Sequence, residues 1–319
     1  QPQGGLGPSG EFTFVVSEPL TGRLTQPSAY RRADGAANLQ LQHPTRHVSV
    51  WREAGGVDDT VAAVAVAHHS GLARNLVAYA SVRGGEGVVS LREQASGFRR
   101  FATQLGAPFR PAGLAFAAYN ASTLAHGCGG ASTDPAACSV APVLVVVGSV
   151  ATTAGVSVAT AAGVAASTPG FGGNDAFVGV VHPITGALLH LTVVGDTDGQ
   201  QWTAVTAVPA RAPNHGTSVV LAGTAITRPP QLGITAAASA SAVEGIVVRY
   251  AGVSAAQLAA PPVWAVVVGH AVDATTVDLG AVVLSPGLRP EDDVVVVSGT
   301  YSGGKLQAGT LAELAAPTG

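Results

Sequence analysis

Hydrophobic positions along this chain fall into short segments separated by turn residues. In some segments large apolar and small residues alternate, as in Ala63–Val66, and in others the apolar run is continuous, as in Val143–Val147 and Val294–Val297. Alternation predicts strands with one buried face, whereas continuous β-branched runs predict strands covered on both faces. Because helical periodicity is almost absent, the pattern predicts an all-β fold.

One strand-and-turn signature recurs along the chain. Residues Glu11–Gly22 align with Asp175–Gly186: each has an acidic residue, an alternating apolar strand, and then Pro-x-Thr-Gly. Weaker copies begin at Glu86 and Glu244, and a last copy spans Gly309–Gly319. Recurrence of this kind predicts an internally repeated architecture.

Two further strand signatures follow the first one in each repeat. The second is rich in Ala and Val and occurs at residues 62–66, 114–118, 203–208 and 280–284. The third is a valine-rich strand ending in Gly, Ser or Thr, at residues 76–81, 143–149, 218–224 and 293–300. Further strands are expected around Leu39–Val50 and Trp264–Val268. The repeats predict a flexible N-terminal segment at residues 1–10, followed by four full units at residues 11–85, 86–173, 174–243 and 244–304. The first strand of a fifth unit is predicted at residues 305–319.

The order of these signatures resembles a known family. Asp175-Ala-Phe-Val, then Pro-x-Thr-Gly186, then an Ala-Val strand and Val219-Val-Leu-Ala-Gly-Thr224 are similar to the seven-bladed β-propeller repeats called SBBP repeats. The resemblance implies an all-β propeller built from diverged blades, in a secreted or cell-surface protein and often within a long multidomain chain. Fewer units occur here than a closed seven-bladed ring needs, which favours one piece of a longer protein or a ring closed by pairing terminal strands.

Charge is scarce in this sequence. Only 11% of residues are charged, the net charge is −3, and Met is absent. A surface with so little charge repels its neighbours weakly and suits a protein that packs against copies of itself or carries glycans. No basic patch indicates a nucleic-acid partner. The uncharged stretch at residues 135–173 is interrupted by Pro142, glycines and hydroxyl residues, so buried strands explain it better than a membrane span.

A polar insertion carries two indications of an extracellular location. Cys128 and Cys138 lie too far apart for a CxxC metal knuckle, and no second pair completes a four-ligand site, so a local disulfide is favoured over a metal or redox pair. Asn120-Ala-Ser122 is an N-glycosylation sequon in the same insertion. Both features predict an oxidising, secreted or cell-surface setting. The chain's Gln1 start also fits a mature end left after removal of a signal peptide.

Candidate chemistry is weak elsewhere. Asp196 and Asp198 could bind calcium as paired acids in a glycine turn, although Asp-Gly is first of all turn chemistry. Asn214-His-Gly-Thr217 resembles the histidine motif of subtilisin-like proteases, but no nucleophilic serine segment follows it. Trp51, Trp202 and Trp264 are expected to pack between sheets, with a sugar-binding platform as the alternative.

The expected function is therefore a non-enzymatic structural or adhesive module of an extracellular assembly, such as a matrix, filament or appendage. Its partners would be copies of itself, other extracellular structural proteins or glycans, with no cofactor. The arginine-rich, lysine-poor composition together with the sequon suggests an algal ciliary surface as one setting. A propeller that binds a glycan or protein ligand is the first alternative, and a hydrolase the second.

Overall fold

The fold was analysed in a computed structural model of the chain. The residues that it describes are 13–17, 31–32, 39–40, 47–51, 60–69, 74–93, 98–106, 108–118, 142–151, 156–159, 165–168, 171–207, 218–234, 243–269, 275–285, 293–303 and 307–308. Antiparallel strands make up most of this part of the chain, which confirms the all-β prediction.

Three successive sheets follow one plan, in which four strands pair antiparallel in chain order; in the second sheet the separate hairpin β11–β12 is inserted between the second and third strands. The first sheet holds β5 (Thr60–His69), β6 (Arg74–Arg83), β7 (Glu86–Glu93) and β8 (Arg99–Gly106). The second holds β9 (Phe109–Ala118), β10 (Pro142–Ala151), β13 (Asn174–Val181) and β14 (Leu188–Val194). The third holds β15 (Gln200–Ala207), β16 (Val219–Ala225), β17 (Glu244–Tyr250) and β18 (Trp264–Gly269), with the short β21 (Gln307–Ala308) at its edge.

The remaining strands form two-stranded sheets. The last sheet consists of β19 (Thr275–Ser285) and β20 (Val294–Gly303). Near the N-terminus, β1 (Thr13–Ser17) pairs with β4 (His47–Trp51), and β2 (Arg31–Arg32) pairs with β3 (Leu39–Gln40). A small hairpin joins β11 (Val156–Ala159) to β12 (Ala165–Thr168). Strands β3, β4 and β18 lie where the sequence predicts further strands.

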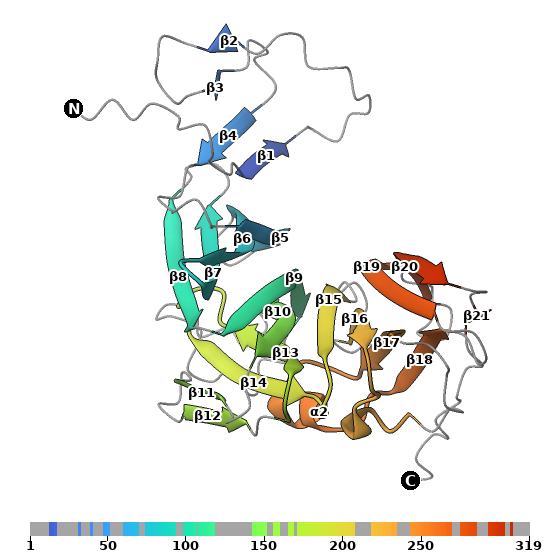
Figure 1. The fold of residues 1–319 in the computed structure, drawn as a ribbon. Coiled ribbons are helices and arrows are strands. Elements are labelled where there is room, and N and C mark those ends of the chain that lie inside the picture. Colours follow the sequence, from blue (N-terminus) through green and yellow to red (C-terminus); the bar gives the residue numbers. More distant parts are fainter. Residues whose placement is uncertain are drawn as a thin grey trace.

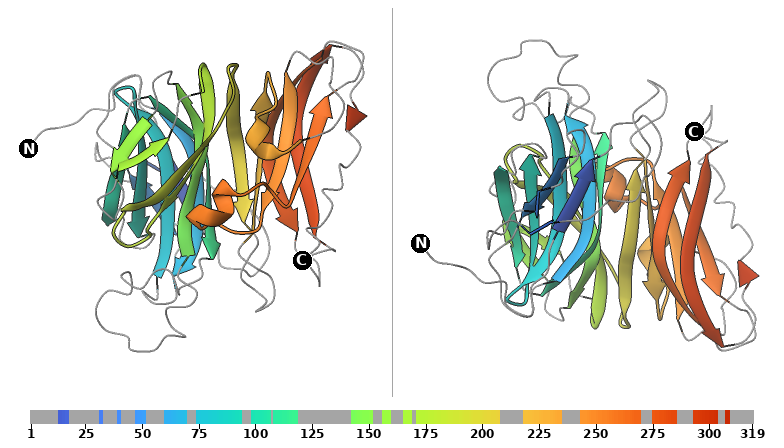
Figure 2. Two further views of the ribbon diagram at one scale, coloured as in Figure 1. Left: turned by 90° about the horizontal axis from the view of Figure 1, so that it is seen from below. Right: turned by 90° about the horizontal axis from the view of Figure 1, so that it is seen from above.

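The sheets follow one another side by side along an arc (Figures 1 and 2). The first strands β5, β9, β15 and β19 lie on the inner side of this arc (Figure 1), and β9 contacts both β5 and β15. The pair β1–β4 lies at the end of the arc formed by the first sheet, and β19–β20 lies at the opposite end (Figures 1 and 2). Neighbouring sheets thus cover each other's faces, and the two ends of the arc have only one neighbouring sheet each.

The three sequence signatures fall at equivalent places in successive sheets. The Ala- and Val-rich signature lies on the first strands, the valine-rich signature on the second strands β6, β10, β16 and β20, and the acidic strand-and-turn signature on the third strands β7, β13 and β17. Each repeat read from the sequence therefore begins on the third strand of one sheet and ends on the second strand of the next.

Alternating side chains from each central strand fill the two spaces beside it. From β10, Leu144 and Val146 pack with the first sheet, whereas Val143, Val145 and Val147 pack with the third. From β16, Val219 and Leu221 face the second sheet, and Val220 and Ala222 face the last sheet. A strand covered on both faces in this way needs the continuous apolar run that the sequence shows.

A β-bulge recurs at one fixed place on β5, β9, β15 and β19, the first strands of the three larger sheets and of the last sheet. The residue of the second strand opposite the bulge is Ser81, Gly148, Gly223 or Gly299. A Cβ atom on any of these three glycines would clash with a backbone oxygen of the bulged strand, at Arg110, Gln201 and Asp278 respectively. The glycine in the valine-rich signature is thus explained by close backbone approach.

Helical structure is minor among the described residues. The one-turn helix α2 (Ala255–Ala259) begins at Ser254, which forms a capping box with Gln257, and its Leu258 is buried beside β14. No helix in the described part of the chain is long and apolar enough to span a membrane.

Candidate functional site

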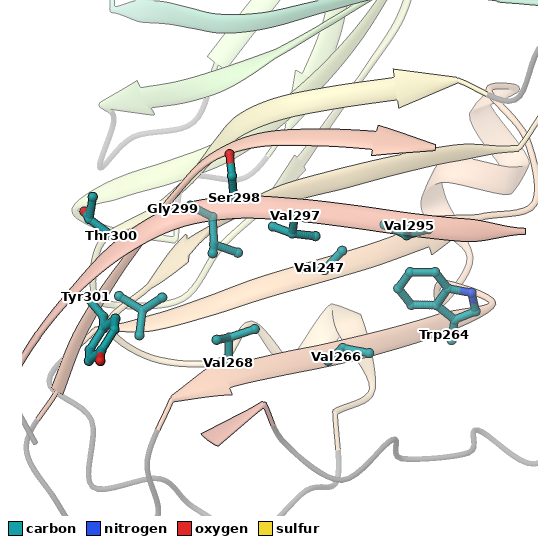
Figure 3. A pocket seen from close by; sticks show the side chains of 12 residues that line it. Val247, Trp264, Val266, Val268, Val295, Val297, Ser298, Gly299, Thr300 and Tyr301 are labelled. Carbon is teal, nitrogen blue, oxygen red and sulfur yellow. The ribbon is translucent and has the colours of Figure 1, made fainter. Parts of the chain in front are cut away.

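A groove lies between the third sheet and the two-stranded last sheet (Figure 3). Its volume is about 570 Å³, and its lining comes from β17, β18, β19 and β20. The lining residues are Val247, Trp264, Val266, Val268, Val277, Leu279, Val295, Val297, Ser298, Gly299, Thr300 and Tyr301. The groove therefore offers an apolar surface with Trp264 at one end and Tyr301 at the other, while the side chains of Ser298 and Thr300 point to the opposite side of β20 (Figure 3).

The groove is open because the last sheet has only two strands among the described residues. In β18, Trp264, Val266 and Val268 are only partly buried and line the groove, whereas Ala265 and Val267 on the other face are buried. The first sheet shows the filled arrangement: Phe101 and Leu105 on its fourth strand pack with Leu188 and Leu191 on the fourth strand of the second sheet. Among the described residues, no such fourth strand covers the face of β18 that lines the groove.

The same sheet also presents an open edge and an open face. Among the described strands, β20 pairs with β19 alone. On the face turned away from the third sheet, Val283, Val294 and Val296 are 57–60% exposed, although they belong to uninterrupted apolar runs. Uncovered valines beside an unpaired strand edge form a surface on which another strand or sheet can dock.

Charged groups near this site serve as structural ion pairs. At the start of β20, the side chain of Asp293 is 1% exposed and accepts a hydrogen bond of 3.0 Å from Nη2 of Arg249 on β17. Arg249 Nη2 also donates to Ser218 Oγ at 3.0 Å. This ion pair fixes β20 to the third sheet, and neither of its members lines the groove.

Within the third sheet, a second ion pair is buried. Arg228 donates from Nε and Nη2 to the two carboxylate oxygens of Glu244, at 2.7 and 2.8 Å. Hydrogen bonding to Glu244 raises the pKa of Arg228, with burial acting in the opposite direction. This bidentate geometry clamps the loop after β16 to the start of β17.

Asp196 and Asp198, the weak candidates for a calcium site, lie in the loop between β14 and β15. The Asp196 carboxylate accepts a hydrogen bond from the backbone N–H of Thr197 at 2.7 Å, and Gln200 Oε1 accepts one from the Asp196 N–H at 3.0 Å. Asp198 is exposed. Across the described residues, no three side chains of His, Cys, Asp or Glu gather as a metal site. The observed contacts are those of a turn.

Several sequence predictions concern residues outside the described part of the chain. These are the Cys128–Cys138 disulfide, the glycosylation site at Asn120 and the protease-like histidine at position 215. All three stay predictions. Of the tryptophans, Trp202 is 3% exposed in the core between the second and third sheets, as expected for packing, whereas Trp264 lies at one end of the groove.

Asp175 and His190 are polar groups whose burial the sequence does not indicate. Asp175, at the start of β13, is fully buried; the Phe171 N–H donates to its Oδ2 at 3.1 Å, and its Oδ1 has no hydrogen-bond partner among the described residues. Burial raises the pKa of Asp175, and the hydrogen bond from Phe171 partly opposes this. Burial disfavours the charged imidazolium and so lowers the pKa of His190 on β14. The sequence shows Asp175 as the acid of the repeat signature, but it does not show that this acid lacks a cationic partner among the described residues.

Comparison with known proteins gives no assignment. No model of a known protein family matches the chain, and no curated protein matches it significantly. The functional argument therefore rests on the sequence and the geometry of the groove, the open edge and the open face.

Proposed function

We propose that this chain is a non-enzymatic structural or adhesive module of an extracellular or cell-surface assembly, and that its sheets are the blades of a β-propeller. The observation that carries the proposal is the chemistry at the open end of the arc. Among the described residues, the groove lining contains no Asp, Glu, His, Lys, Arg or Cys, and a strand edge that no described strand pairs with and uncovered valines adjoin it.

Such a surface is suited to polypeptide docking. Chemistry on a bound substrate needs convergent acids, bases or nucleophiles, whereas apolar packing and strand pairing need only shape and free backbone groups. Scarce charge across the whole chain supports the same conclusion, since weak repulsion permits close lateral packing.

The blade interpretation is supported by the sheet plan. Consecutive four-stranded antiparallel sheets, packed face to face with their first strands on the inner side of an arc, have the connectivity of propeller blades. The bulge and its opposing residue recur in the same place from sheet to sheet, which indicates a repeated unit.

Glycan binding in the groove is a second candidate function. Trp264 provides an aromatic surface at one end of the groove, and Tyr301 provides a hydroxyl group at the other (Figure 3). Aromatic stacking combined with hydrogen bonding is a common way to hold a sugar. Glycan-array binding that disappears in Trp264→Ala would favour this function over the structural one.

The structural proposal is tested by the state of the protein purified from its source. We expect a large assembly in light scattering, a mass decrease after glycosidase treatment at Asn120, and no free thiol before reduction. A small, unmodified monomer with free thiols at every concentration would overturn the proposal.

A further inference from the structure

The N-terminal strand β1 has the sequence of a third strand but lies in no four-stranded sheet. Its signature, Glu11–Gly22, is the one found on β7, β13 and β17. Each of those three strands pairs antiparallel with the valine-rich second strand of its own sheet. In contrast, β1 pairs with β4 alone among the described strands, and the last sheet has a second strand, β20, without a third.

The strand registers of the three complete sheets fix how such a strand would align. In each complete sheet, the residue two positions after the signature acid pairs with the residue opposite the bulge. The three pairs are Val88 with Ser81, Phe177 with Gly148, and Ile246 with Gly223. In β1 the residue two positions after Glu11 is Thr13, and in β20 the residue opposite the bulge is Gly299. The same rule therefore sets Thr13 opposite Gly299 and Val15 opposite Val297.

The two ends of the arc also match in the character of their faces. At the first sheet, Val64 and Val66 of β5 are 46% and 57% exposed, while Ala63 and Ala65 face the second sheet. At the last sheet, Val283, Val294 and Val296 are uncovered. Inside the molecule, faces of this kind are covered by the neighbouring sheet, as Val220 is covered by β19.

We infer that β1 of one copy pairs antiparallel with β20 of a second copy, in the register that sets Val15 opposite Val297. The pair β1–β4 of the second copy then supplies the third and fourth strands of the last sheet. Strand β4 lies over the face of β18 that lines the groove. One head-to-tail contact thus accounts for the unpaired edge, the groove and both exposed valine faces. The inference deepens the structural function proposed above and rests on it.

A second copy is the occupant because the two halves of this sheet stand at opposite ends of one molecule (Figures 1 and 2). Joining opposite ends of identical molecules is a heterologous contact, which propagates into a ring or a filament. In the copy that provides β1 and β4, a short segment, residues 52–59, leads from β4 to the first strand of its own first sheet, β5. Short segments also lead into the first strands of the other sheets, at residues 107–108, 195–199 and 270–274, so the connection from β4 to β5 is of the kind that links one sheet to the next.

Two single-cysteine proteins test the register between copies. In a background of Cys128→Ser and Cys138→Ser, one preparation carries Val15→Cys and the other Val297→Cys. After mixing and mild oxidation, we expect a disulfide-linked heterodimer, identified by mass spectrometry of the linked peptides that contain positions 15 and 297. The matched control replaces Val297→Cys with Val294→Cys, which lies three residues out of register on the opposite face and should give only background linkage.

Three outcomes would overturn the inference. The first is no linkage between the Val15→Cys and Val297→Cys proteins, and the second is equal linkage in the out-of-register control. The third is a monomeric disulfide in the doubly substituted Val15→Cys/Val297→Cys chain at high dilution, which would mean that the chain's own β1 pairs with β20. If the wild-type protein still assembles in these cases, the structural function survives while the strand-pairing inference fails.

A measurement without cysteines guards against misfolded variants. Val294→Lys/Val296→Lys places charges on the exposed face of β20, and we expect loss of the assembly in sedimentation velocity. Val263→Lys is the matched control, because Val263 is 51% exposed but lies outside this face. Unchanged far-ultraviolet circular dichroism would show that the sheets remain folded. If Val294→Lys/Val296→Lys still assembles, the head-to-tail contact is contradicted.

Discussion

The third sheet and the last sheet have similar strand sequences but different surroundings. Val220 on β16 and Val296 on β20 occupy equivalent places, three residues before the glycine that opposes the bulge. Val220 is fully buried because β19 packs on it, whereas Val296 is 57% exposed because no described strand or sheet covers it. An apolar strand sequence thus allows burial of both faces, but a face is buried only where a neighbouring sheet packs against it.

The largest expected effect concerns the Arg228–Glu244 ion pair of the third sheet. Arg228→Ala leaves the Glu244 carboxylate, whose side chain is 7% exposed, without its bidentate partner. We expect the free energy of unfolding, measured by urea denaturation, to fall by about 3–5 kcal/mol. The double substitution Arg228→Met/Glu244→Leu is the control and should recover most of this loss. A loss under about 1 kcal/mol in Arg228→Ala would show that the pair behaves as an exposed one.

The bulge positions test whether the last sheet shares the backbone of the third. Gly223→Ala and Gly299→Ala each direct a Cβ atom against a backbone oxygen, so each should lower stability by about 3 kcal/mol. At Gly280 a Cβ atom has open space around it, which makes Gly280→Ala the matched control. Thermal unfolding followed by circular dichroism measures all three. Tolerance of Gly299→Ala alone would mean that the bulge in β19–β20 relaxes more easily than that in β15–β16.

The equivalent valines test the role of the neighbouring sheet directly. Val220→Ala removes buried methyl groups and should lower the free energy of unfolding by about 2 kcal/mol. In Val296→Ala, measured at a concentration where the protein is monomeric, we expect a change of about 0.5 kcal/mol or less. Equal losses would contradict the conclusion that the face of β20 is uncovered in one copy.

The smallest effect concerns the acid that begins the third strand. Glu244 is paired with Arg228 in the third sheet, whereas the equivalent Asp175 in the second sheet has a pKa raised by burial. A raised pKa means that the folded state binds the proton more tightly than the unfolded state. Stability of the wild type relative to Asp175→Asn should therefore rise as pH falls through the folded pKa, and the rise is complete below about pH 4. Urea denaturation at several pH values measures this difference, and a flat difference contradicts it.

Much of the fold could be predicted from residue patterns. The three signatures located the first, second and third strands, and Trp264–Val268 was expected as the strand that became β18. The start of each sheet was harder to see. The clearest repeat begins with an acid and ends with Pro-x-Thr-Gly, and both mark the third strand rather than a sheet boundary.

Less of the candidate site could be predicted. Trp264 was singled out, but Val266, Val295 and Val297 look like ordinary core residues in the sequence. They line a groove because no described strand lies in front of β18, and a strand's own sequence does not show which neighbouring strands are present. Asp196 and Asp198 illustrate the converse, since their spacing suggests a cation site while their contacts are those of a turn.

The sequence by itself determined the strand class and the repeat, because side-chain period and β-branching are local properties. Only the tertiary structure decided the register between strands, which apolar faces are covered, where the groove lies, and which acids have a cationic partner. Those properties depend on pairing and packing between segments distant in the chain, and similar strand sequences give buried or exposed faces according to what lies beside them.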